Sequence, residues 1–180
     1  MRKHLILAAA PLALVAVPAL AQNATGTVDV TGSVAGRCLF TTATDLIPLG
    51  ELALPGSDSN AGKLDAAVVN AGSAELVGWC NHAAATMDVE ATALTNLAPV
   101  ADGFTNVIDY TAVATATNEA TASDTTTVAG AGTASNLGMY TGPIAVTIDD
   151  AASANKLLVA GAYTGLIKVT LKPNYTPPSP

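Results

Sequence analysis

Apolar and polar residues alternate one by one in several stretches of the chain. The clearest stretch is residues 24–34 (ATGTVDVTGSV), where small apolar residues alternate with polar ones over eleven positions. Shorter alternating runs occupy residues 74–80, 87–94, 108–117, 144–148 and 167–171. Successive side chains of a β-strand point to opposite faces, so a period of two predicts strands that each turn one face to a core.

The stretches between these runs are rich in turn-forming residues, as in PGSDSN at 55–60. Residues 119–136, rich in Thr, Ala and Gly, are weakly patterned and predict a loop or an irregular edge strand. Apolar residues are nowhere sustained at helical spacing, and strands do not alternate with helices. The pattern therefore predicts an all-β protein built as an antiparallel β-sandwich.

The alternating faces also predict which side chains form the core. We expect the following residues to be buried: Val77, Trp79, Val89, Tyr110, Ile144, Val146, Tyr163, Ile167, Val169 and Leu171.

The N-terminus has the composition of a secretory signal peptide. A basic start at Arg2 and Lys3 precedes an apolar run over residues 5–20, and residues 19–21 (ALA) form a small-x-small cleavage site. A membrane anchor is the alternative, but the run is short for a full span and contains two prolines. We expect residues 1–21 to be a signal peptide that leads to the periplasm and then the cell surface. No second stretch suits membrane insertion.

Charge and composition exclude nucleic acid as a partner. Cleavage would remove two of the seven basic residues and none of the fourteen acidic ones, which gives the remaining chain a formal charge of 5 − 14 = −9. Phosphate binding needs clustered Lys and Arg, and an acidic chain with few aromatic residues lacks them. About 159 residues would remain, enough for one domain with its own core.

The chain has two cysteines, Cys38 and Cys80, and both lie in the exported part, where oxidation is expected. We therefore expect a disulfide between them. The alternative, a reactive or metal-binding thiol pair, is disfavoured because no Cys-x-x-Cys spacing occurs and His82 is the only histidine after the signal peptide. We expect no metal site.

No group of residues has the composition of a catalytic site. Nucleophilic catalysis usually needs a histidine as base, and His82 is better explained as a turn residue. The pair Asp149 and Asp150 is explained as a solvated loop pair rather than half of a calcium or glycosidase site. The glycines form no phosphate-binding motif. We expect no enzyme activity and no cofactor.

Three segments together resemble subunits of chaperone–usher pili, particularly the archaic type that shares the spore-coat-protein-U domain. The first is TGTVDV at 25–30, which runs on to Cys38. The second is LVGWC at 76–80, a strand that ends in the second cysteine. The third is GAYTGLIKVTL at 161–171, which is similar to the last strand of those pilins. Residues 173–180, with four prolines, extend beyond that strand.

The resemblance implies an immunoglobulin-like sandwich that lacks its last strand. A periplasmic chaperone first donates the missing strand, and the N-terminal extension of the next subunit then replaces it. An outer-membrane usher and neighbouring or related pilus subunits would be further partners. Residues 22–34 would be the donor, residues 35–172 the sandwich and residues 173–180 a Pro-rich tail. The alternation of the donor would place Ala24, Gly26, Val28 and Val30 in the groove.

The residues leave other hypotheses open. Residues 22–34 are alternatively the first strand of their own sandwich, and the chain is then a monomeric exported surface or binding domain that does not polymerise. A periplasmic hydrolase is the third hypothesis. The leading hypothesis is a structural subunit of a surface fibre, assembled by donor-strand complementation.

Overall fold

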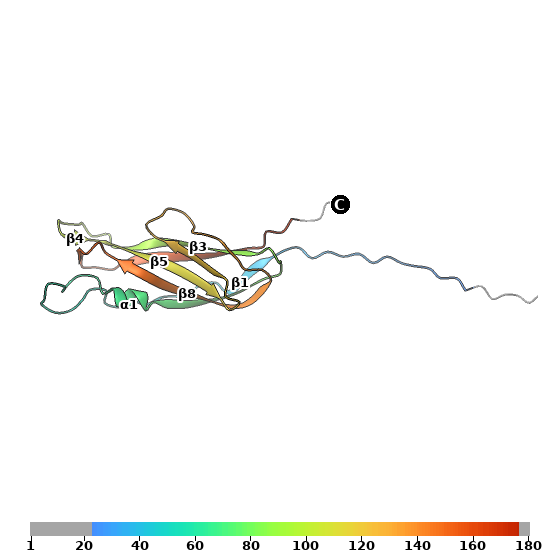
Figure 1. Cartoon of the computed structure of the whole chain (residues 1–180), viewed down its shortest axis with the longest axis horizontal. Helices are drawn as coiled ribbons and strands as arrows, with labels where there is room; N and C mark the ends of the chain where they lie inside the picture. Colours follow the sequence, from blue (N-terminus) through green and yellow to red (C-terminus); the bar gives the residue numbers. More distant parts are fainter. Residues whose placement is uncertain (1–22, 177–180) are drawn as a thin grey trace, which may run out of the picture. The chain divides into compact units, whose positions relative to one another are not determined.

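A computed structural model describes residues 23–176 of the 180-residue chain. The predicted signal peptide and the last four residues of the Pro-rich tail lie outside the described residues. The chain divides after Ser33 into an N-terminal segment and a compact body that begins at Val34 (Figure 1). The body is all-β and antiparallel apart from one short parallel pair, which confirms the predicted fold class.

The body contains ten strands and one short helix within the described residues. In chain order these are β1 (Cys38–Thr42), α1 (Ala66–Asn70), β2 (Ser73–Cys80), β3 (Thr86–Thr95), β4 (Phe104–Thr105), β5 (Val107–Ala116), β6 (Thr121–Thr125), β7 (Ser135–Asn136), β8 (Tyr140–Ala152), β9 (Leu157–Leu158) and β10 (Thr164–Lys172). Five of the alternating runs in the sequence therefore became β2, β3, β5, β8 and β10.

The strands run in the order β1-β2-β8-β5-β3-β10, with β6 added beside β5 and β7 beside β3. One layer consists of β1, β2, β8, β6 and most of β5, and the other consists of β3, β7 and β10. Strand β5 joins the two layers because its first residues pair with β3 and its remainder pairs with β8. Strands β4 and β9 form a separate two-residue pair. Strands β1 and β10 stand at the two ends of the order, so each has one edge without a strand partner among the described residues.

The core lies between these layers. Its largest fully buried side chains come from α1, β3, β5 and β8, and they are Val69, Met87, Val89, Ile108 and Ile144. Tyr110 and Val146 are also buried, as predicted, while Tyr163, Ile167, Val169 and Leu171 are partly buried and pack against the core. Eight of the ten predicted core residues are therefore buried or packed against the core.

The predicted face of β2 is wrong. Val77 and Trp79 are not part of the core cluster, whereas Leu76 packs against it and Cys80 is buried within it. A Cβ on Gly78 would lie 3.1 Å from the side chains of both Phe40 and Leu171. Leu76, Gly78 and Cys80 therefore face inward, and the alternation places their neighbours on the outer surface.

The weakly patterned stretch over residues 119–136 contains β6 and β7 joined by loop, as the composition predicted. Helix α1 was not predicted, because five residues are too few to show a helical period. The side chain of Asp65 caps it by accepting a hydrogen bond from the Ala67 N–H at 3.2 Å.

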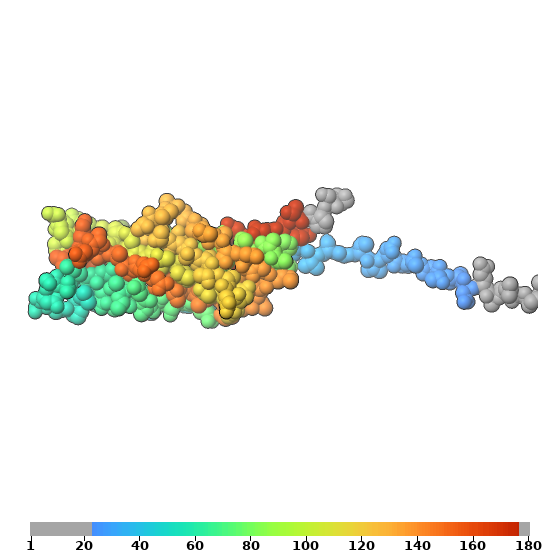
Figure 2. All heavy atoms as spheres, in the orientation of Figure 1, coloured from blue at the N-terminus to red at the C-terminus, as the bar shows by residue number. Residues whose placement is uncertain are grey.

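The residues just before β1 and the described residues just after β10 lie together at one end of the body. The side-chain oxygen of Asn81 accepts from the Arg37 N–H at 2.6 Å, and its amide donates to the Ala35 carbonyl at 3.0 Å. Tyr175, three residues beyond β10, lies against Gly36. Figure 2 shows these light-blue and red segments at the same end of the body. Because β10 has nine residues, its start lies about 30 Å away, toward the other end.

Candidate functional site

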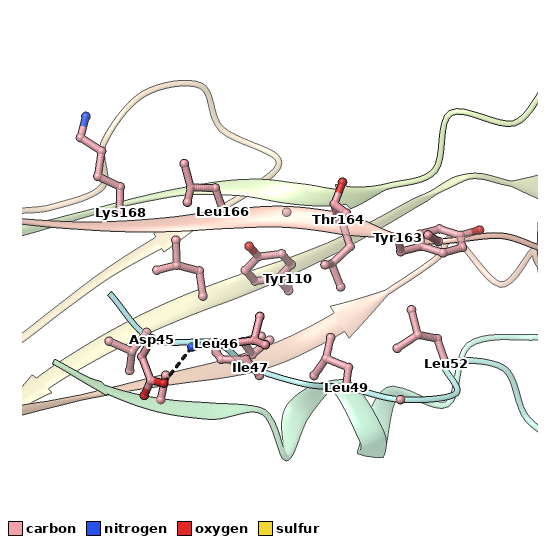
Figure 3. A pocket seen from close by; sticks show the side chains of 18 of the residues that line it. Asp45, Leu46, Ile47, Leu49, Leu52, Tyr110, Tyr163, Thr164, Leu166 and Lys168 are labelled. Carbon is pink, nitrogen blue, oxygen red and sulfur yellow. Dashed lines mark hydrogen bonds between the residues drawn. The ribbon is translucent and has the colours of Figure 1, made fainter. Parts of the chain in front are cut away.

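The main feature of the body's surface is an apolar groove of about 910 Å³. One wall is the segment 43–53, which follows β1, and the other is formed by residues 158–169, which include most of β10. Figure 3 shows Leu46, Ile47 and Leu49 on one side, Thr164, Leu166 and Lys168 on the other, and Tyr110 between them. The floor is formed by apolar side chains of four strands: Ala74, Leu76, Leu94, Tyr110, Val146 and Ile148.

The first wall has no strand pairing over residues 43–52. Pro48 has no N–H to donate to a ladder, and it stands between two residues that pack on the core, Ile47 and Leu49. The neighbouring Leu46 remains 77% exposed. The wall thus packs against the body through side chains and leaves backbone groups and an apolar side chain uncovered.

Asp45 fastens this wall to β2. One carboxylate oxygen accepts from the Glu75 N–H at 2.9 Å, and the other accepts from the Leu46 N–H at 2.8 Å. These two hydrogen bonds lower the pKa of Asp45, and the bond from Glu75 has the larger effect. The stabilisation from these hydrogen bonds is therefore complete above the ordinary pKa of an aspartate, and it is lost as the pH falls through the lowered pKa of Asp45.

The second wall is the unpaired edge of β10. On its other edge β10 is bonded to β3 in a ladder that includes Ile167 opposite Ala91 and Val169 opposite Val89. Leu166, on the outer face, is 62% exposed. An unpaired edge beside exposed apolar side chains is a template for another strand.

Tyr110 lies in the floor of the groove, and its hydroxyl donates to the Thr92 carbonyl at 2.8 Å. Burial, and secondarily the negative charge of Asp124, raise the pKa of Tyr110 to about 12. At the far end, the Tyr163 hydroxyl donates to the carbonyls of Val159 and Thr105 at 3.0 and 3.1 Å. Burial also raises the pKa of Tyr163.

These shifts predict a loss of stability in strong base. The folded state keeps the proton of Tyr110 up to about pH 12, whereas the unfolded chain releases it near the ordinary pKa of about 10. The stabilising contribution is therefore complete below pH 10 and is lost as the pH rises to about 12. Urea unfolding at a series of pH values should show this decline, and Tyr110→Phe should make it shallower. An equal decline in both proteins would contradict the assignment to Tyr110.

The predicted donor residues lie in the N-terminal segment. Residues 23–33 form no strand and all are exposed, with Val28 at 88% and Val30 at 92%. The strand predicted here from the alternation is therefore absent from the single chain. A strand requires a partner for its backbone groups, and the pattern alone does not supply one.

The predicted disulfide is confirmed. Cys38 and Cys80 are bonded, and they lie opposite each other where β1 begins and β2 ends. Residues 43–52 continue directly from β1, so the disulfide anchors the start of the strand that leads into the first wall of the groove.

The sequence did not reveal the groove. The spacing of Ile47 and Leu49 by two residues was the available signal for the first wall, but Pro48 breaks the strand pattern between them. Nothing local indicates that residues 43–53 face residues 158–169, because more than a hundred positions separate them in the chain.

The other residues considered from the sequence do not form a site with one another. The His82 side chain accepts from the Ala84 N–H at 3.3 Å in the turn between β2 and β3, and its ring contacts Tyr175. Asp149 and Asp150 lie on β8 rather than in a loop, where its pairing with β5 is irregular, and both are exposed. Across residues 23–176 no three acidic, histidine or cysteine side chains gather as metal ligands. In the same part of the chain, no helix has the length and apolar character to cross a membrane.

Comparison with known proteins gives no match: no family model, no curated protein and no solved structure is similar to this chain at a significant level.

Proposed function

We propose that this chain is a structural subunit of an exported surface fibre, in which the groove of one copy receives residues 23–34 of the next copy as an additional strand. The observation that carries the proposal is the open groove itself. It combines an apolar floor, an unpaired strand edge on β10 and a facing wall without a ladder. A strand inserted there would pair with the open edge of β10 and cover the apolar floor.

The N-terminal segment has the alternating apolar and polar residues that would fit such a groove. Its alternation would turn Ala24, Gly26, Val28 and Val30 toward the floor, and its threonines toward water. The two valines are almost fully exposed in the single chain, so their transfer into an apolar groove is favourable. Backbone bonds to β10 would add affinity.

The position of the chain ends favours one direction for the inserted strand. Residues 34–37 enter the body at the end where β10 finishes. An inserted strand antiparallel to β10 would leave the groove at the opposite end, near Thr164, and its body would continue from there. A parallel strand would leave at the end already occupied by the receiving copy's own chain termini. Antiparallel insertion therefore gives an open, head-to-tail series of copies.

A periplasmic chaperone and an outer-membrane usher would act before the fibre forms. A groove with an apolar floor and a free strand edge is a hazard for aggregation while it is empty. A chaperone that occupies the groove with its own strand until the next copy arrives would remove that hazard.

The test is assembly of the purified chain that begins at Gln22. We expect a ladder of oligomers on unheated SDS gels, which an excess of a synthetic peptide of residues 22–34 shortens by competing for the groove. A peptide with the same sequence except Val28→Asp is the matched control and should leave the ladder unchanged. A chain that stays monodisperse in size-exclusion chromatography at all concentrations, and binds neither peptide, would support a monomeric surface domain instead.

A further inference from the structure

The rim of the groove carries one cation. Among the residues that line it, Lys168 is the only basic side chain, and it lies on the exposed outer face of β10. Its ammonium group is 3.0 Å from a carboxylate oxygen of Glu90 on the neighbouring strand β3. The Lys168 side chain is nevertheless 60% exposed. Since an ammonium has three donors, it can also donate a hydrogen bond to a second carboxylate on the open side of β10.

The N-terminal segment carries one charge. Asp29 is the only ionisable residue in positions 23–33, and it lies on the polar side of the alternation, between Val28 and Val30. When those valines enter the groove, the carboxylate of Asp29 is directed to the outer face, which is the face that carries Lys168. The single anion of the donor and the single cation of the groove rim are thus on the same side of the completed sheet.

We infer that Asp29 of one copy pairs with Lys168 of the next, and that this pair sets the register of the inserted strand. The inference rests on the proposed function and adds to it the partner, a second copy of this same chain, and the pairing. Lys168 would then stand between two carboxylates, Glu90 on β3 and Asp29 on the donor, in a row across three strands. Opposite charges placed directly across a strand pair stabilise that pairing.

The lengths of the two strands agree with this register. With Asp29 opposite Lys168, residues 28–33 of the donor lie opposite β10 from Val169 back to Thr164, which is the part of β10 that lines the groove. Val34 is the last residue that can enter, because Asn81 holds Ala35 and Arg37 to the donor's own body. The donor therefore ends where β10 begins, and no gap is left between them.

The side chains on the inner face also fit. Val28 lies opposite Val169 and Val30 opposite Ile167, two β10 residues that pack against the core. Gly26 lies opposite Leu171, just beyond the lined part of the groove, where the side chains of Leu171 and Phe40 both come within 3.1 Å of a Cβ built on Gly78. This crowding favours a donor residue without a side chain at that point.

Lys172, four residues further along β10, is the other cation with which Asp29 could pair. It pairs with Asp88, whose side chain is only 8% exposed and has one oxygen without any other partner. Removing Lys172 from that carboxylate would leave a buried charge unpaired, which is costly. A register that places Asp29 beside Lys172 would also move Val28 beyond the end of β10, opposite Pro173.

The register is tested by cross-linking between copies of the full mature chain. Asp29→Cys is combined in separate proteins with Lys168→Cys, Leu166→Cys, Thr170→Cys or Lys172→Cys, and each protein is assembled, mildly oxidised and run on denaturing gels without reductant. We expect a covalent ladder with Lys168→Cys that is at least about tenfold stronger than with any other partner, because a disulfide tolerates only a narrow range of Cα separations.

The outcomes separate the register from the proposed function. A covalent ladder at position 166, 170 or 172, with none at 168, would overturn the Asp29–Lys168 pairing and leave strand donation intact. The absence of any ladder in all four proteins would overturn both. A second measurement uses Asp29→Asn and Lys168→Gln: each should speed dissociation of the assembled copies by about two- to fivefold, the effect of losing an exposed ion pair. The double variant should be no faster than either single one, whereas additive effects would contradict the pairing.

Discussion

Replacing Val28 by Asp should abolish assembly of the chain into oligomers. In the proposed donor strand this side chain lies opposite Val169 on the inner face of β10, whereas Lys168, the only basic side chain among the lining residues, lies on the outer face. Burying an unpaired charge costs several kcal/mol, and even about 4 kcal/mol weakens binding about a thousandfold. Val30→Asp should have the same effect, because Val30 belongs to the same face of the alternation.

The matched control is Thr27→Asp, which introduces the same charge one position away on the opposite face. It should assemble like the unmodified chain, because its carboxylate stays in water. Assembly is measured as the ladder on unheated SDS gels and as mass in size-exclusion chromatography. Since Val28 and Val30 are already exposed in the single chain, thermal unfolding of the monomer should be unchanged by all three substitutions. Intact assembly of Val28→Asp would disprove the donor role, and loss of monomer stability would instead place this segment in its own core.

Removing the disulfide should cost a large part of the stability of the body. Cys38 and Cys80 are separated by 42 positions, and closing a loop of that size in the unfolded chain corresponds to about 4 kcal/mol. Domains of this size are stable by only about 5–15 kcal/mol. The double variant Cys38→Ala/Cys80→Ala should therefore unfold at a much lower urea concentration than the oxidised chain.

The double variant avoids the free thiol that a single substitution would leave. Its effect should extend to the groove, because β1 leads directly from Cys38 into the first wall. We expect weaker binding of the peptide of residues 22–34 as well as lower stability. An independent control is Asp45→Asn, which removes the carboxylate that ties this wall to β2 but keeps the disulfide. It should weaken peptide binding with a smaller loss of stability. Equal urea midpoints for the oxidised chain and the double cysteine variant would contradict the predicted stabilisation.

The sequence determined the features that depend on neighbouring positions. An alternation with a period of two is a local property, so it located β2, β3, β5, β8 and β10, and eight of the ten side chains predicted for the core are buried or packed against it. The pairing of the two cysteines needed no knowledge of the fold, because there was only one pair to form. The donor-like segment was also visible as an unusually regular alternation over residues 24–34.

The tertiary structure decided everything that depends on which strands meet. An alternation does not say which of its two faces is inner, and on β2 the inner face was fixed by the packing of Phe40 and Leu171 over Gly78. The same alternation at residues 24–34 formed no strand, because a strand exists only where another edge satisfies its backbone groups. The groove arises between residues 43–53 and 158–169, which approach each other only when both layers are folded. Local patterns therefore predicted the strands, and the pairing of distant segments formed the groove.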